Sequence, residues 1–152
     1  MPLRRRITIL ALVVALGTAP LTGCSGSAED QRAGYCEAVS THSATLTRIA
    51  DEEGAGGFLS ALPILEELGR EAPRDLVDEW ATLLNALHGL RDALQAAGLE
   101  PDDVAGELPD DLAEAERRRI RGAASVLASP EVQRATAGIE QHALDVCGVS
   151  LL

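Results

Sequence analysis

Cysteine and histidine are the residue types with the most distinctive chemistry in this sequence, and each occurs three times. Cys24 closes a basic and apolar front segment, whereas Cys36 and Cys147 lie near the two ends of the remaining chain. A thiol can be acylated, can pair in a disulfide or can bind a metal together with histidine. Which of these reactions occurs depends on the cellular compartment of the protein, because disulfides persist outside the cytoplasm. The segment before Cys24 predicts that compartment.

The front segment has the pattern of an export signal. The arginines at positions 4–6 form a positive flank, and the apolar run 7–16 is followed by Gly17 and Pro20. A helix that crosses a bilayer takes about 20 apolar residues, more than this run provides. Residues 1–23 are therefore predicted to be a signal peptide, and the paired arginines leave both the general and the twin-arginine export routes open.

The end of this segment, Leu21-Thr22-Gly23-Cys24, resembles the bacterial lipobox, in which a branched residue and two small residues precede a cysteine. The resemblance implies that the Cys24 thiol takes a diacylglycerol and that cleavage makes Cys24 the new N-terminus. Residues 24–28 would then be a lipidated cysteine and a short tether on the extracytoplasmic face of the cell membrane. Two acyl chains, such as palmitate, anchor a protein stably where one is marginal. The alternative is an ordinary signal peptide beside a chance cysteine.

If Cys24 is acylated, Cys36 and Cys147 remain in a compartment where disulfides persist, and we expect them to be bridged. Two free thiols or a metal site are the alternatives. A metal site would also need His42 and His142. At about 100° per residue in an α-helix, each histidine is rotated by roughly 120° to 140° from its own cysteine and faces outward. We therefore expect no metal.

Apolar residues at spacings of three and four predict five helices, which run from about residue 28 to 50, 57 to 71, 73 to 97, 111 to 128 and 129 to 147. Pro63 either kinks the second helix or delays its start to Leu62. Ser129 is an expected N-cap, and Gly98 and Gly148 are expected at helix ends. The positions predicted to face the core are Tyr35, Cys36, Val39, Ser43, Leu46, Ile49 or Ala50, Phe58, Leu62, Leu65, Leu68, Leu76, Val77, Trp80, Leu83, Leu84, Leu87, Leu90, Leu94, Leu112, Ile120, Ala123, Ala124, Leu127, Val132, Thr136, Ile139, Ala143, Val146 and Cys147.

These helices predict an all-α fold, a bundle of about five helices in a single domain over residues 29–152. Cys36 lies near the start of the first helix and Cys147 at the end of the last. A bridge between them therefore requires these two helices to run antiparallel, side by side. With one tryptophan, one tyrosine and one phenylalanine, the core must be mostly aliphatic.

The acidic charge of the chain argues against nucleic acid as a partner. Without the arginines at positions 4–6, ten arginines face 24 acids, which is a net charge of −14. Such a surface repels phosphates, so we expect no nucleic-acid binding, and the membrane contact must come from the lipid. The scarcity of aromatic residues also excludes stacking platforms for bases or sugars.

Two charged stretches can each be interpreted either as a binding site or as solvent-exposed surface. The stretch 98–111 could offer oxygen ligands to calcium, but it lacks the EF-hand spacing, which favours a solvated linker. Its acids are Glu100, Asp102, Asp103, Glu107, Asp110 and Asp111. The arginine run 117–121 is interpreted as a solvated face supported by the spacing of Glu114 and Arg118, with a docking patch for a partner as the alternative.

Trp80 and His88 are the other candidate site residues. Trp80 is expected in the core, with a ligand pocket as the alternative, and His88 is expected at a half-buried polar edge rather than in catalysis. The sequence has no G-x-S-x-G, no phosphate-binding glycine loop and no H-E-x-x-H. We therefore expect neither an enzyme nor a cofactor.

The lipobox, the pair Tyr35-Cys36, the pair Leu62-Pro63 and the run 142–148 together resemble small lipid-anchored helical proteins of actinobacteria. This resemblance implies location and fold and transfers no catalytic residue. We expect a non-catalytic binding or structural role in the cell envelope, with an envelope protein as the partner. The alternative is a lipoprotein that binds a small ligand in an enclosed apolar cavity.

Overall fold

A computed structural model of the chain describes residues 27–53, 57–101 and 108–151. All regular structure in these ranges is helical, which confirms the predicted all-α class. The elements are α1 (Ala28–Glu53), α2 (Gly57–Ser60), α3 (Leu62–Glu71), the 3-10 turn η2 (Arg74–Leu76), α4 (Val77–Ala96), α5 (Glu114–Leu127), α6 (Pro130–His142) and the π-helical turn η4 (Ala143–Cys147). The predicted signal peptide and Cys24 lie outside the described residues, as does the acidic segment 102–107. No helix in the described part is both long and apolar enough to cross a bilayer.

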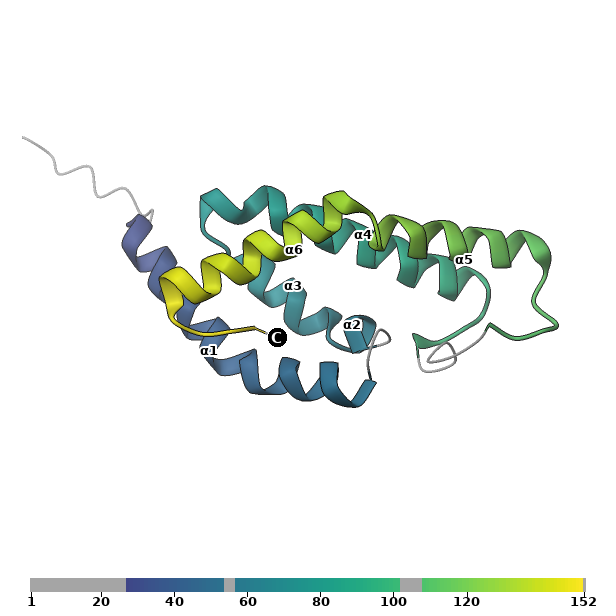
Figure 1. The fold of residues 1–152 in the computed structure, drawn as a ribbon, viewed down its shortest axis with the longest axis horizontal. Coiled ribbons are helices and arrows are strands. Elements are labelled where there is room, and N and C mark those ends of the chain that lie inside the picture. The colour runs from purple at the N-terminus through teal and green to yellow at the C-terminus, as the bar shows by residue number, and fades with distance from the viewer. Residues whose placement is uncertain (1–26, 54–56, 102–107, 152) are drawn as a thin grey trace, which may run out of the picture.

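Helix α4 lies at the centre of the arrangement and packs against α3, α5 and α6 (Figure 1). Helix α1 packs against α2 and α3, and it meets the C-terminal part of the chain at η4. The two ends of the described chain therefore come together where α1 contacts η4, while α6 lies along α4 (Figure 1).

Local signals in the sequence account for the helix ends. Ser27 and Asp30 form a reciprocal cap, since each backbone N–H donates to the other side chain, at 3.0 and 3.1 Å. Ser129 caps α6 as predicted, accepting from the backbone N–H of Val132 at 3.4 Å. Gly98 and Gly148 have φ of 70° and 69°, the left-handed conformation in which glycine is favoured after a helix.

The core is aliphatic apart from two aromatic side chains. Its most completely buried large side chains are Trp80, Tyr35, Leu68, Leu87, Leu94 and Val39. Because the remaining buried positions are leucine, isoleucine, valine and alanine, the helices approach closely and enclose little polar surface.

One of the two predicted effects of Pro63 is confirmed, because α3 begins at Leu62 with Pro63 in its first turn, where a missing N–H is tolerated. Other predicted boundaries and faces are wrong in detail. The fourth helix begins at Glu114 rather than at residue 111. Val77 is 49% and Val146 is 43% exposed, and Ala124 is also exposed. These three positions lie at the margins of apolar stripes, where periodicity alone does not separate buried from exposed.

Candidate functional site

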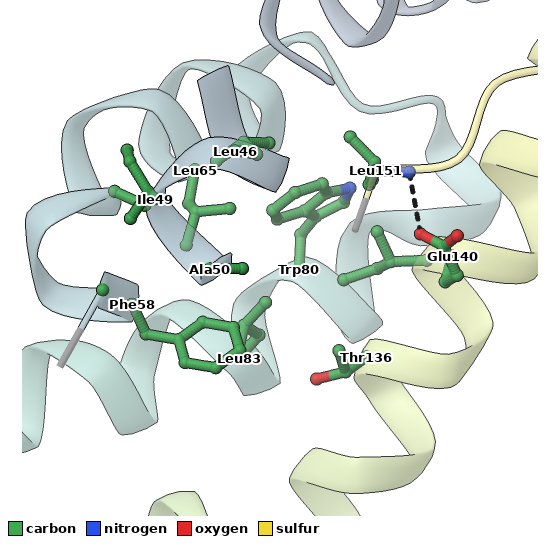
Figure 2. Close-up of a pocket in the computed structure, with 13 residues that line it drawn as sticks. Leu46, Ile49, Ala50, Phe58, Leu65, Trp80, Leu83, Thr136, Glu140 and Leu151 are labelled. Atoms are coloured by element: carbon green, nitrogen blue, oxygen red, sulfur yellow. Dashed lines mark hydrogen bonds between the residues drawn. The ribbon is translucent and has the colours of Figure 1, made fainter. Parts of the chain in front are cut away.

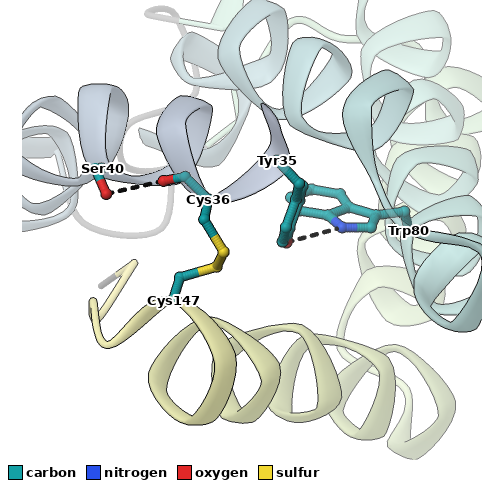
Figure 3. Close-up of a disulfide and its surroundings, with 5 residues drawn as sticks. All are labelled: Tyr35, Cys36, Ser40, Trp80 and Cys147. Carbon is teal, nitrogen blue, oxygen red and sulfur yellow. Dashed lines mark hydrogen bonds between the residues drawn. A yellow bond between two sulfur atoms is a disulfide. The ribbon is translucent and has the colours of Figure 1, made fainter. Parts of the chain in front are cut away.

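Cys36 and Cys147 form the predicted disulfide, which excludes both free thiols and a cysteine metal site (Figure 3). The Cα atoms are 5.1 Å apart and the cysteines are separated by 111 positions in the sequence. Cys36 lies in the first part of α1 and Cys147 is the last residue of η4. The bond therefore joins the start of the described chain to its end.

The two histidines of the considered metal site lie in different environments. His42 pairs with Glu67 of α3, with 3.4 Å between Nε2 and Oε2. The ring of His142 packs edge to face on Tyr35, with centroids 5.9 Å apart, and its Nε2 is buried without a hydrogen-bond partner among the described residues. Across residues 27–53, 57–101 and 108–151, no three His, Cys, Asp or Glu residues are placed to hold a metal ion.

The expectation that both histidines face outward is wrong for His142. It assumed an α-helix of about 100° per residue up to Cys147. The turn η4 is π-helical, with hydrogen bonds that span five residues, and therefore winds by a smaller angle per residue. This change of winding brings His142 toward the face that carries Cys147.

The remaining predicted candidates have structural partners. His88 is at a half-buried edge as expected, with its Nε2 2.8 Å from Glu66 Oε1. Arg118 pairs with Glu114 at 3.4 Å, as the four-residue spacing predicted. Arg117, by contrast, is only 17% exposed and donates to the Pro109 carbonyl at 2.7 Å, so it fastens the preceding loop instead of belonging to a solvated face.

A small, partly open apolar cavity lies between α1, α2, α3, α4 and α6, close to Trp80 (Figure 2). Its free volume is about 40 Å³. That volume accommodates a few water molecules but not a drug-sized ligand, whose pocket measures about 300–1,000 Å³. The lining residues are Leu46, Ile49, Ala50, Gly57, Phe58, Ala61, Leu65, Trp80, Leu83, Thr136, Ile139, Glu140 and Leu151.

An open groove of about 450 Å³ lies beside this cavity and is bounded largely by α6. It shares four lining residues with the cavity, namely Phe58, Leu83, Thr136 and Glu140. Its other lining residues are Leu127, Val132, Gln133 and Ala137. The cavity and the groove are therefore adjacent, and these four residues form the wall that they share.

Glu140 is the one charged residue among those that line the two hollows. Its Oε1 accepts from the Ser150 hydroxyl at 2.6 Å, and its Oε2 accepts from the backbone N–H of Leu151 at 3.0 Å (Figure 2). The carboxylate thus holds the segment that follows η4 and leaves Leu151 buried at the cavity wall, 4% exposed.

Tyr35 and Trp80 meet close to the cavity. The Trp80 indole N–H donates to the Tyr35 hydroxyl oxygen at 3.2 Å (Figure 3). Burial raises the pKa of the Tyr35 phenol, the Trp80 hydrogen bond opposes that rise, and the negative charge of Glu140 adds to it. Tyr35 is therefore a neutral packing residue at ordinary pH.

Trp80 is in the core, as expected. It also lines the small cavity, which is not large enough for the ligand pocket that was the alternative. Reasoning from the sequence missed Glu140 and Leu151 completely. A weak signal was present for Glu140, which follows Thr136 by four positions on the inward face of the last helix. A carboxylate at such a position is a candidate for a role in the interior.

Comparison with known proteins adds no relative to this description. No family model, curated protein or solved structure matches the chain.

Proposed function

We propose that this chain is a membrane-anchored lipoprotein on the extracytoplasmic face whose helical domain binds an envelope protein without catalysing a reaction. The resemblance to small lipid-anchored helical proteins of actinobacteria is part of this proposal. So is the division of the chain into a signal peptide (1–23), a lipidated tether (24–28) and a helical domain (29–152).

The observation that carries the binding role is the open apolar groove beside α6. Its walls come from Phe58, Leu83, Leu127 and Val132. Leu83 and Val132 are buried, so the accessible apolar surface comes mainly from the half-buried Phe58 and Leu127, and an apolar groove can serve as a docking site. A groove that is open along one side suits side chains presented by a partner protein. A small ligand is instead usually enclosed over most of its surface.

The negative charge of the protein favours a partner that carries basic groups beside its apolar groups. The lining of the groove contains the acid Glu140 and no arginine, and the whole chain has a net charge of −11. Complementary charge speeds association and disfavours acidic partners. We therefore expect an apolar segment with neighbouring arginine or lysine.

The small-ligand alternative has less support, because the cavity beside Trp80 has a free volume of only about 40 Å³ and the larger groove is open to solvent. An enzyme also has little support. The carboxylate of Glu140 accepts hydrogen bonds from the Ser150 hydroxyl and from the backbone N–H of Leu151, which is a structural role in holding the C-terminal segment.

Membrane anchoring is supported by the lipobox and by the disulfide, since disulfides persist outside the cytoplasm. The test is Cys24→Ala in the full precursor, followed by fractionation of cells. We expect the variant to leave the membrane fraction, whereas Cys36→Ala, with Cys24 intact, should remain there. Retention of Cys24→Ala in membranes would contradict lipidation.

The docking role is tested by photo-crosslinking in intact cells, with the probe at Gln133 or Ala137 in the groove and at Thr41 on α1 as the control. We expect one common adduct from both groove positions and none from position 41. Ala137→Arg should abolish the adduct at position 133, because it fills the groove and repels a basic partner. Equal adducts at position 41, or adducts that persist with Ala137→Arg, would argue against this surface.

The antiparallel, side-by-side course of the first and last helices also remains a proposal, supported by the bridge between Cys36 and Cys147. Spin labels at the exposed positions 52, 131 and 145 test it. An antiparallel course requires a shorter distance from 52 to 131 than from 52 to 145. The reverse order would reject it.

A further inference from the structure

The segment Gly148–Leu151 lies at the cavity that adjoins the proposed docking groove. It begins directly after the disulfide-bonded Cys147, at a glycine whose φ of 69° turns the chain. The backbone N–H of Val149 donates to the Ala143 carbonyl at 3.2 Å, so the root of the segment is held by η4. Its far end is held by Glu140 of α6.

Leu151 fills space that would otherwise belong to the cavity. Its side chain is 4% exposed and stands beside Trp80 and Glu140 in the cavity wall (Figure 2). With Leu151 in place, about 40 Å³ remains free. Departure of this side chain would enlarge the cavity and open it toward the groove, since Glu140 lines both.

We propose that residues 148–151 form a strap that closes the inner cavity, with Leu151 as the plug and Glu140 as the latch, and that the docking groove gains this cavity only when the strap leaves. This inference rests on the proposed function and concerns the regulation of the same site. A partner that brings an apolar side chain and a basic group offers replacements for both contacts, because Leu151 supplies an apolar side chain and an N–H donor.

The strap has a defined hinge. The disulfide at Cys147 fixes the residue before Gly148 to α1, so opening at Gly148 breaks the hydrogen bond from Val149 to Ala143 but leaves the bridge to α1 in place. Between Gly148 and the buried Leu151 lie only Val149, which is half-buried, and Ser150, which is exposed. Local opening without global unfolding is the expected behaviour of a short segment of this kind.

The test uses native-state hydrogen exchange of the full chain with its disulfide intact. In the native protein, we expect the Leu151 amide to exchange faster than the amides of Leu68 and Leu87 in the core. Glu140→Gln keeps the size of the latch and removes its charge, so exchange at Leu151 should rise by about tenfold, as expected when a hydrogen bond to a charged acceptor becomes one to a neutral acceptor. Glu131→Gln removes an exposed charge from the same helix and should change nothing.

A second measurement uses Trp80, the only tryptophan of the sequence. Leu151→Ala should increase quenching of Trp80 fluorescence by acrylamide at an unchanged circular dichroism spectrum. Leu144→Ala, which truncates a leucine that is 45% exposed, is the matched control and should leave quenching unchanged.

Exchange at Leu151 that equals exchange in the core, in the native protein and in Glu140→Gln, would overturn the strap. So would quenching of Trp80 that Leu151→Ala leaves unchanged. These measurements need no partner, so the strap and the docking role can fail separately. Faster exchange at Leu151 without a groove crosslink would keep the strap and reject the docking role.

Discussion

The indole N–H of Trp80 donates a hydrogen bond to the hydroxyl oxygen of Tyr35 across 3.2 Å, and the two rings meet edge to face with centroids 6.5 Å apart. This contact joins α4 to α1 in the core. Tyr35 is the only tyrosine and Trp80 the only tryptophan of the sequence, so each reports spectroscopically on this one contact.

Tyr35→Phe should destabilise the fold, because it leaves the buried indole N–H of Trp80 without an acceptor. An unsatisfied buried donor costs about 1–3 kcal/mol, and we expect the free energy of unfolding in urea to fall by that amount. Thr47→Val, which removes the hydroxyl of an exposed residue on the same helix, serves as the control. A loss for Tyr35→Phe no larger than for Thr47→Val would show that the hydrogen bond contributes nothing net.

High pH should destabilise the protein through Tyr35. Burial raises its pKa in the folded state, whereas the unfolded chain keeps a value of about 10. The folded state thus holds the phenolic proton more tightly, so stability is fully present below pH about 10 and falls as the pH rises above it. The chain has no lysine, which leaves few other groups to titrate in this range.

This dependence is measured from tyrosinate absorbance and from urea unfolding across the alkaline range. Tyr35→Phe should reduce the loss of stability at high pH, because phenylalanine has no phenolic proton to lose. A tyrosinate titration at the ordinary pKa in the folded protein would contradict the burial of this group.

Removal of the disulfide should be strongly destabilising. The bridge closes a separation of 111 residues, and the chain-entropy model assigns about 4–5 kcal/mol to a loop of this length. Cys36→Ser with Cys147→Ser should lower the free energy of unfolding by an amount of that order, and a reducing agent should reproduce the effect in the native chain. A loss below about 1 kcal/mol would mean that the unfolded chain is already restricted near these residues.

Two helical glycines form a matched pair for testing the packing of α3 on α4. A Cβ at Gly89 meets nothing within 4 Å, so Gly89→Ala should stabilise by about 0.5–1 kcal/mol through helix propensity. A Cβ at Gly69 would lie 2.7 Å from Leu84 Cδ1, which must move away.

The free energy of unfolding of Gly69→Ala should therefore be lower than that of Gly89→Ala by about 1 kcal/mol or more, which is the size of a typical overpacking cost. Thermal and urea unfolding of the two variants measure the difference. Equal stabilisation would indicate that Leu84 moves away freely and that α3 does not pack tightly on α4 at this point.

Much of the fold was predictable because its signals are local. The repeating apolar positions determined which segments are helical and which face holds Val39, Leu68 or Leu87. Ser129 and the two left-handed glycines determined helix ends. The lipobox resemblance at Cys24 left Cys36 and Cys147 as the expected pair. Predictions failed where one turn changed its winding, as at η4, and where a residue stands at the margin of a stripe, as Val77 does.

The sequence by itself therefore determined a series of amphipathic helices and an expected pair of bridged cysteines. It did so because hydrophobic periodicity and helix caps depend on residues only a few positions apart. Only the tertiary structure decided that Glu140 holds Leu151, that His142 turns onto Tyr35, and that a cavity lies next to a groove beside α6. Those relations depend on how helices distant in sequence pack together. Spacing along one helix carries no information about the neighbours that it meets.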